Sequence, residues 1–127
     1  MTTTDPQTTV IIIDDEIELI QGITAYLKTF NIDVVGTGHN GLDAVCLYEK
    51  RRPDYVLIDL NMPNYDGHYG ISKIKEMNNN AKIIIMTGFM QKIKNEKLDS
   101  EIPVLEKPFR LAELKKIIEG PKNTHKF

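Results

Sequence analysis

The feature that most constrains this chain is a series of short apolar segments, each ending in a turn and followed by a longer segment with helical spacing. Runs of about four to eight residues rich in Val and Ile suit strands buried on both faces of a sheet. The predicted strands are residues 10–13, 34–36, 55–59, 82–87 and 103–106. Strands that alternate with helices in this way predict an α/β fold, with a parallel sheet covered by helices on both faces.

The intervening segments carry apolar side chains three and four positions apart, which is typical of helices with one core-facing side. The first predicted helix has Ile20, Ile23, Leu27 and Phe30 on that side. Asn40 precedes the second helix and is a favoured N-cap residue, and Asp66-Gly67 is a turn before the third helix. Residues 89–101 are polar with few apolar positions, so we expect a short fourth helix that is mobile and becomes ordered on partner binding.

The composition fits a single ordinary globular domain. The chain has 127 residues, of which 41% are hydrophobic and 27% charged, and its net charge is −2. This charge gives no general reason to expect binding to nucleic acid or membranes. No apolar stretch reaches the ~20 residues of a membrane helix, and the N-terminus lacks the features of a signal peptide.

We expect a flexible lead-in over residues 1–8, one domain over 9–120 and a loose tail over 121–127. The single cysteine, Cys46, cannot form an internal disulfide, which favours a cytoplasmic location, and we expect it to be a small core residue on a helix.

Polar side chains follow four of the five predicted strands. Asp14 and Asp15 follow the first, Asp59 ends the third, Thr87 ends the fourth and Lys107 follows the fifth. Because the carboxyl ends of parallel strands lie at the same edge of a sheet, these side chains are predicted to converge. Three neighbouring carboxylates repel one another unless a cation or a proton joins them. Mg²⁺, which prefers oxygen ligands, is the expected partner.

A cation beside an aspartate, with a lysine and a hydroxyl nearby, makes a site for a phosphoryl group. Mg²⁺ and Lys107 can neutralise the phosphoryl oxygens, and the Thr87 hydroxyl can donate a hydrogen bond to them. Gly88 has no side chain, so its backbone N–H can come close to the phosphoryl group. Asp59 can then act as the nucleophile that accepts the group.

Four short motifs in this order resemble the receiver domain of two-component response regulators. The matching residues are Asp14-Asp15, Asp59-Leu60-Asn61-Met62-Pro63 with Asp66-Gly67, Thr87-Gly88, and Lys107-Pro108-Phe109. The resemblance covers residues ~9–120. It implies a flavodoxin-like (βα)5 three-layer sandwich with strand order 2-1-3-4-5, the order already known for receivers.

The resemblance also implies roles for individual residues. Asp59 is expected to be the phosphoacceptor, and its phosphoryl group is expected to be contacted by Asn61, Thr87 and Lys107. Asp15 and Asp59 are expected to bind Mg²⁺ directly. The remaining metal contacts are expected from Asp14, mainly through water, and from the backbone carbonyl of Asn61. The bond between Lys107 and Pro108 is expected to be cis.

For the whole protein, we expect a stand-alone response regulator, because the sequence ends soon after the fifth predicted helix. It is expected to accept the phosphoryl group from a sensor histidine kinase or a histidine phosphotransfer protein and to switch protein–protein contacts. It is not expected to be an enzyme beyond its own phosphorylation and a slow autodephosphorylation. The sequence does not identify the kinase or the downstream target, nor does it distinguish a diffusible messenger from a phosphorelay intermediate.

Two other functions compete with this one. A phosphatase with an aspartyl nucleophile usually has a second aspartate two residues later as acid and base, and here that residue is Asn61. A phosphorylation-independent adaptor on the same fold is the stronger alternative. Its support is Val104, because receivers commonly have an aromatic residue three positions before the lysine, where it turns inward on activation.

Overall fold

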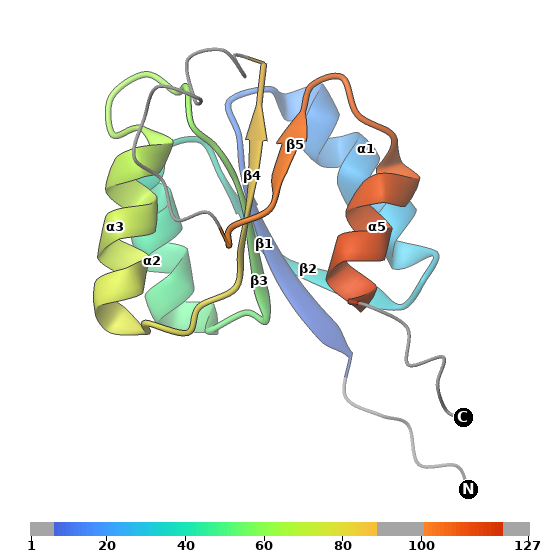
Figure 1. Ribbon diagram of the computed structural model, residues 1–127, viewed down its shortest axis with the longest axis horizontal. Helices are drawn as coiled ribbons and strands as arrows, with labels where there is room; N and C mark the ends of the chain where they lie inside the picture. The colour runs from blue at the N-terminus through green and yellow to red at the C-terminus, as the bar shows by residue number, and fades with distance from the viewer. Residues whose placement is uncertain (1–6, 89–100, 121–127) are drawn as a thin grey trace, which may run out of the picture.

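The structure is a computed structural model that describes residues 7–88 and 101–120. In these residues five strands form one sheet, and each neighbouring pair is parallel (Figure 1). The strand order is β2-β1-β3-β4-β5, which confirms the predicted order. The strands are β1 (Thr8–Ile13), β2 (Ile32–Gly38), β3 (Tyr55–Asp59), β4 (Ile83–Thr87) and β5 (Val104–Glu106).

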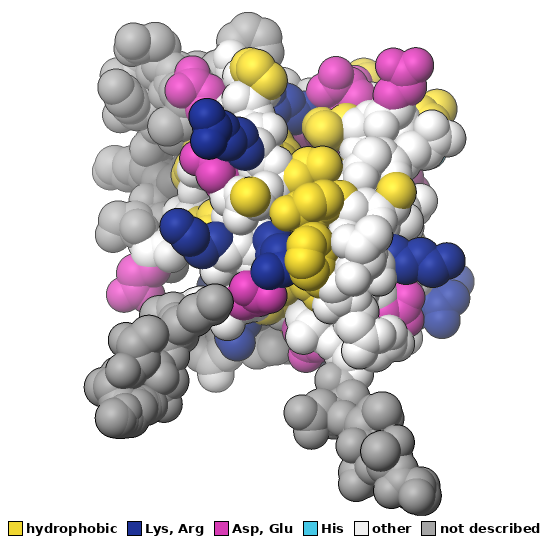
Figure 2. Space-filling view, turned by 90° about the vertical axis from the view of Figure 1, so that its right-hand side faces the viewer, with side chains coloured by type: hydrophobic (Ala, Val, Ile, Leu, Met, Phe, Trp, Pro, Cys, Tyr) yellow, Lys and Arg dark blue, Asp and Glu magenta, His cyan; other side chains and the backbone are white. Residues whose placement is uncertain are grey.

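Helices cover both faces of the sheet and make the predicted three-layer α/β sandwich. One face is covered by α1 (Ile17–Lys28) and α5 (Leu111–Glu119), and the other by α2 (Gly41–Arg51) and α3 (Gly67–Met77) (Figure 1). On the α1–α5 side, hydrophobic side chains form a strip down the middle, with charged side chains beside it (Figure 2). None of the helices in the described residues has the length and hydropathy to cross a bilayer.

The central strands carry runs of apolar residues because both of their faces are buried. Alternate residues of a strand point to opposite faces of a sheet. Thus Ile11 and Ile13 of β1 belong to the core under α2 and α3, whereas Val10 and Ile12 belong to the core under α1 and α5. All four are fully buried, and burying an Ile side chain stabilises the fold by about 1.5–3 kcal/mol.

The predicted helix cap at Asn40 is confirmed, and Asp66, which the sequence placed only in a turn, also caps its helix. The Asn40 side chain accepts a hydrogen bond from the Asp43 backbone N–H at 2.9 Å, and Asp66 accepts one from Tyr69 at 3.1 Å. Each bond satisfies a backbone donor in the first helical turn that has no partner within the helix. The two caps set where α2 and α3 begin, at the same edge of the sheet as the carboxyl end of β3.

Two core predictions are wrong. Phe30 is 43% exposed because α1 ends at Lys28 and the chain turns away, so its ring packs on Tyr26 under the Lys115 ammonium. Cys46 is exposed because Ala44 and Tyr48 occupy the buried side of α2.

The structure bears on the predicted N-terminal lead-in but not on the predicted fourth helix. Strand β1 already includes Thr8, which was assigned to the lead-in. The predicted mobile fourth helix lies almost entirely outside the described residues, so it stays a prediction.

Candidate functional site

The register of the sheet brings Asp14 next to Asp59. Ile13, the last residue of β1, pairs with Ile58 of β3. The next residue along each strand is therefore an aspartate, and both leave the sheet at its carboxyl edge. Both side chains are buried, Asp14 with no exposed surface and Asp59 with 5%.

The same edge receives Thr87 from the end of β4 and Lys107 from just after β5. Asp59 pairs with Met86 of β4, so Thr87 lies one residue further along. Thr87 in turn pairs with Glu106 of β5, and the Lys107 backbone N–H donates to the Thr87 carbonyl at 2.7 Å. The structure thus brings together the residues that sequence spacing alone placed at strand ends.

Three carboxylates form a compact acidic cluster at this edge. One oxygen from each of Asp14, Asp15 and Asp59 lies within 4.8 Å of the others, and Asp15 is exposed whereas its two neighbours are buried. Opposite ligands of an octahedral Mg²⁺ lie about 4 Å apart, so a cluster of this size and this oxygen chemistry fits the ion. Asp14, Asp15 and Asp59 are the side chains that would hold it.

Lys107 is the cation that the cluster contacts. Its Nζ lies 2.7 Å from Asp14 Oδ2, 2.7 Å from Glu16 Oε1 and 3.4 Å from Asp59 Oδ2. Burial by itself lowers the pKa of the Lys107 ammonium, but hydrogen bonds to Asp14 and Glu16 and the charges of Asp14 and Asp59 outweigh it and raise that pKa above the ordinary value. Lys107 is therefore held in its charged form.

Burial has the largest effect on the pKa of the two buried carboxyl groups, Asp14 and Asp59. It raises the pKa of Asp14 and of Asp59 above the ordinary value of 3.8. The Lys107 ammonium and backbone N–H groups work in the opposite direction without cancelling the effect. Two carboxylates that are costly to ionise therefore share one ammonium, and added positive charge would stabilise their ionised forms.

Backbone groups after β3 hold the Asp59 carboxylate in place. The Asn61 backbone N–H donates to Asp59 Oδ1 at 3.1 Å, which leaves Oδ2 facing Lys107. Gly88 is exposed, and a Cβ there would meet no atom within 4 Å among residues 7–88 and 101–120. The Lys107–Pro108 peptide bond is cis, as the resemblance implies.

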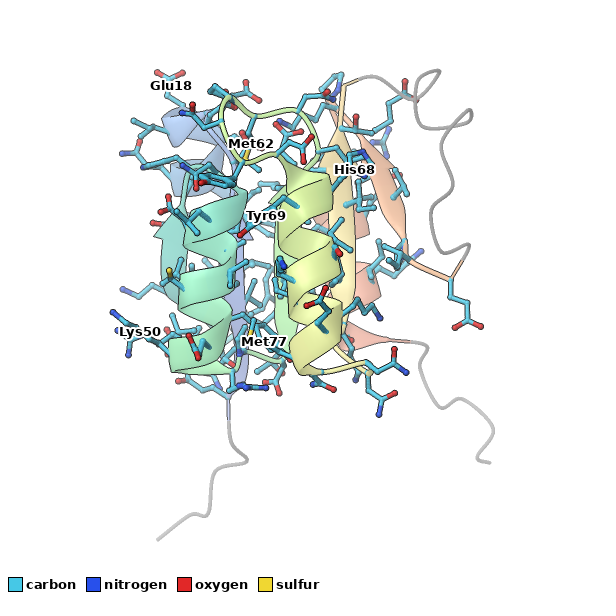
Figure 3. The ribbon with its side chains drawn as sticks, turned by 90° about the vertical axis from the view of Figure 1, so that its left-hand side faces the viewer. Glu18, Lys50, Met62, His68, Tyr69 and Met77 are labelled. Carbon is cyan, nitrogen blue, oxygen red and sulfur yellow. The ribbon has the colours of Figure 1, made fainter. Side chains whose placement is uncertain are left out.

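The loop from β3 to α3 packs very closely on its surroundings. The Gly67 backbone N–H donates to the Leu60 carbonyl at 3.1 Å, and a Cβ at Gly67 would lie only 2.3 Å from the Asp59 carbonyl oxygen. Met62 and Tyr69 lie at this end of α2 and α3 (Figure 3). Sequence reasoning treated Asp66-Gly67 as a turn signal and missed that Gly67 supports the Asp59 backbone directly.

Glu16 was also missed as a member of this site. Its sequence position after Asp14-Asp15 suggested only an acidic helix start, whereas its carboxylate contacts Lys107. The sequence signal that could have identified Glu16 is that it is the third consecutive acidic residue, after Asp14 and Asp15.

Val104 is partly buried and packs against the core under α2 and α3. An aliphatic side chain therefore occupies the position where receivers commonly carry an aromatic ring.

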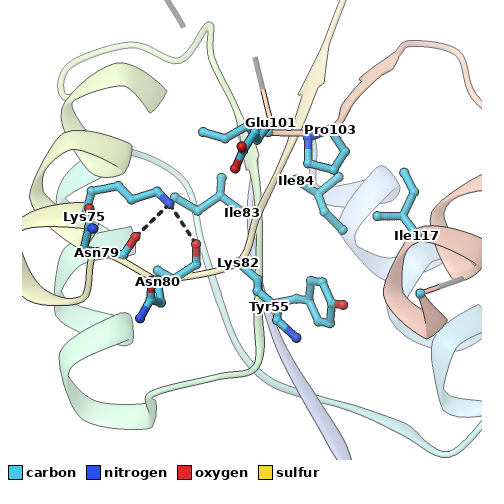
Figure 4. Close-up of a pocket in the computed structure, with 13 residues that line it drawn as sticks. Tyr55, Lys75, Asn79, Asn80, Lys82, Ile83, Ile84, Glu101, Pro103 and Ile117 are labelled. Atoms are coloured by element: carbon cyan, nitrogen blue, oxygen red, sulfur yellow. Dashed lines mark hydrogen bonds between the residues drawn. The ribbon is translucent and has the colours of Figure 1, made fainter. Parts of the chain in front are cut away.

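A separate cavity of about 380 Å³ lies at the opposite edge of the sheet, where β3, β4 and β5 begin (Figure 4). Lys75 donates across it to the Asn79 and Ala81 carbonyls at 3.2 and 3.1 Å. Its cation is thus engaged in closing the connection between α3 and β4. This cavity shares none of its lining residues with the acidic cluster.

Comparison with known families identifies this arrangement. A family model described as the response regulator receiver domain matches residues 10–119. The chain belongs to the response regulator receiver domain family. The receiver domain shows the predicted fold, and its acidic cluster fits the Mg²⁺ site expected for such domains.

Among curated proteins, this receiver domain is similar to the response regulator protein VraR of several staphylococci. It is 35% identical to VraR of Staphylococcus saprophyticus over 83 residues, which cover 65% of this chain and 40% of VraR. The identity to VraR of Staphylococcus aureus is 34% over the same length. The matched region therefore spans about two fifths of these relatives.

Solved structures share its architecture. A chain in the CheX–CheY–BeF3–Mg²⁺ complex from Borrelia burgdorferi is 27% identical with a TM-score of 0.71, and the match covers 84% of this chain and 83% of that one. The REC domain of AraT from Geobacillus stearothermophilus is 28% identical with a TM-score of 0.71, covering 87% and 89%. The PhyR REC domain from Erythrobacter litoralis, at 20% identity, a TM-score of 0.77 and coverage of 86% and 84%, shares the fold.

Proposed function

We propose that this receiver domain is a Mg²⁺-dependent phosphoacceptor that takes a phosphoryl group on Asp59 and thereby changes its contacts with other proteins. The observation that carries the proposal is the Asp59 carboxylate at the end of β3, buried, within 3.4 Å of the Lys107 ammonium and inside a cluster of three aspartates. A buried nucleophile beside a fixed cation suits the transfer of an anionic group.

The transfer itself needs few protein groups. An oxygen of Asp59 attacks the phosphorus of the donor, a P–O bond forms to the carboxylate, and the donor's leaving group departs with the electron pair of the broken bond. Lys107 neutralises charge on the phosphoryl oxygens, and the hydroxyl of Thr87 donates a hydrogen bond to them. When bound, Mg²⁺ supplies further charge neutralisation at the same oxygens. Hydrolysis of the acyl phosphate by water restores the carboxylate and releases phosphate.

The donor in this proposal is a phosphohistidine on a sensor kinase or on a phosphotransfer protein, because family membership places the domain in two-component signalling. The crystal of the similar Borrelia protein contains Mg²⁺, which supports the choice of metal. The domain turns over no other substrate; its chemistry is limited to its own phosphorylation and slow dephosphorylation.

The test is a change in intact mass. Purified protein incubated with MgCl2 and acetyl phosphate should gain the mass of one phosphoryl group, and Asp59→Asn should remove that gain. Asp66→Asn is the matched control, since the Asp66 carboxylate caps α3 and has no part in the acidic cluster. This control should be phosphorylated like the wild type.

Two results would change the conclusion. A wild-type protein that gains no mass with either acetyl phosphate or a phosphorylated kinase would favour the adaptor function, for which Val104 is the sequence indication. A gain that survives Asp59→Asn would place the phosphoryl group on a different residue.

A further inference from the structure

Glu16 occupies a helix N-cap position but does not cap its helix. It precedes α1, and its side chain accepts no hydrogen bond from the first turn. Its Oε1 instead lies 2.7 Å from Lys107 Nζ, a contact across 91 positions of sequence. The side chain is 60% exposed, so this contact is made without the burial that constrains Asp14. An acidic residue that forgoes a local cap for a distant ammonium points to a role at the site.

The three partners of Lys107 differ in what else they do. Asp14 and Asp59 belong to the acidic cluster whose oxygens fit a divalent cation, whereas Glu16 lies outside that cluster. A dication among the aspartates competes with Lys107 for Asp14 and Asp59 and repels the ammonium. Glu16 is therefore the one of the three contacts that Lys107 can keep when the cluster is loaded.

The surroundings leave room for such a shift. A pocket of about 330 Å³ beside the site is lined by Glu16, Leu19, Lys107, Pro108 and Phe109. Glu16 and Lys107 thus line the same pocket, and neither Asp14 nor Asp59 is among its lining residues. The Lys107 side chain is 17% exposed and its Glu16 partner 60%, so a shift of the ammonium toward Glu16 brings it closer to solvent.

We propose that Glu16 is a positioning residue for Lys107, holding its ammonium at the rim of the site while Mg²⁺ occupies the aspartate cluster, and so favouring metal binding. The inference rests on the proposed function, because it assigns Lys107 and the cluster the roles given above. Without Glu16, the ion-pair partners of Lys107 in the described part of the chain are Asp14 and Asp59, and Lys107 competes with the metal for both.

The test is a double-mutant cycle read out as Mg²⁺ affinity, measured by isothermal titration with MgCl2 alone. Glu16→Gln should weaken Mg²⁺ binding about fivefold, the size expected for residues coupled by direct contact. Glu18→Gln is the control, since Glu18 is an exposed acid in the first turn of α1 outside both the ion pairs and the cluster described above (Figure 3). It should change the affinity by less than about twofold.

The second half of the cycle uses Lys107→Met. In that background Glu16→Gln should change Mg²⁺ affinity no more than Glu18→Gln does, because the ammonium that Glu16 holds is gone. A fivefold loss that persists would mean that Glu16 acts on the metal directly, which overturns the inference.

A third variant keeps the inference testable if Lys107→Met does not fold. Glu16→Asp retains the charge but withdraws the carboxylate by one methylene. A loss of affinity above about twofold supports the contact, and wild-type affinity overturns it. A wild-type protein that binds no Mg²⁺ would instead remove the proposed function itself.

Discussion

At the scale of single residues, the main feature of the site is that three carboxylates contact one ammonium group, that of Lys107. Asp14, Glu16 and Asp59 all contact Lys107, and two of them are buried. Removing a charge from such a group relieves repulsion and desolvation, so buried charge is a weak source of stability. In the metal-free protein, the Asp59 carboxylate that the proposed function requires is therefore expected to lower the stability of the fold.

We predict that Asp59→Asn stabilises the metal-free protein at neutral pH by about 1 kcal/mol, because a neutral isostere replaces a buried, crowded carboxylate. Urea denaturation in EDTA measures the free energy of unfolding. The matched control is Asp54→Asn, since exposed Asp54 accepts hydrogen bonds from the Thr9 N–H and hydroxyl, at 2.8 and 3.2 Å. That variant should lose stability, by about 1 kcal/mol. A destabilised Asp59→Asn would show that the carboxylate is favourable where it lies.

The stabilisation should depend on pH with a definite sign. Burial raises the pKa of Asp59 above 3.8, so the folded state binds its proton more tightly than the unfolded state. The contribution of Asp59 to stability therefore falls as pH rises from 3.8 through the raised pKa. The advantage of Asp59→Asn should be full above that window and disappear as pH falls to 3.8. A difference that is constant with pH would contradict this account.

At the scale of elements, the close contact between the start of α3 and the end of β3 fixes the site. A Cβ at Gly67 would lie 2.3 Å from the Asp59 carbonyl oxygen and 2.7 Å from the Leu60 Cα, and neither backbone atom can move without displacing β3. Gly41 shows the same tightness at the start of α2, where a Cβ would meet the Asp66 carbonyl. The loop after Asp59 is thus clamped by two helix starts.

We predict that Gly67→Ala destabilises the protein by about 1–3 kcal/mol, the usual range for overpacking, and slows phosphorylation of Asp59. Gly22→Ala is the control, because Gly22 lies in α1 with no atom within 4 Å of its added Cβ. That variant should gain about 0.5–1 kcal/mol from helix propensity. Chemical denaturation and the mass assay report the two effects, and equal behaviour of the two variants would contradict the clamp.

At the scale of the whole molecule, metal binding should be linked to folding. The cluster draws Asp14 and Asp15 from the end of β1 and Asp59 from β3, so an unfolded chain has no such site. A ligand bound only by the folded state stabilises it by about 2.7 kcal/mol at 100 times its dissociation constant. The thermal midpoint should therefore rise with Mg²⁺ concentration.

We predict that Asp15→Ala sharply reduces this rise, because it removes an exposed ligand without disturbing the buried pair. Asp33→Ala, a substitution of an exposed acid in β2, should respond to Mg²⁺ like the wild type. Thermal unfolding followed by circular dichroism at several MgCl2 concentrations measures both. An undiminished rise in Asp15→Ala would show that Asp15 is not a metal ligand.

The alternation of strands and helices and the residues at the strand ends could be predicted from the sequence, because apolar runs and turn residues are local properties, whereas the strand order was implied by the family resemblance. Asp14, Asp59, Thr87 and Lys107 were expected at one edge of the sheet, and the register places them there. Phe30 was assigned to the core by its helical spacing, and Cys46 because free cysteines are usually buried. Their exposure depends on where a helix ends and on which of its neighbours reach the sheet first.

What the sequence determined by itself, then, was the alternation of strands and helices and the chemical types gathered at one edge. Tertiary structure decided which carboxylates contact Lys107, that Glu16 is one of them, and that Gly67 supports the Asp59 backbone. The physical reason is how far apart in the sequence the interacting residues lie. Burial patterns and caps act over a few residues, whereas charge pairing and close packing depend on distances between atoms that the chain brings together only after the sheet has formed.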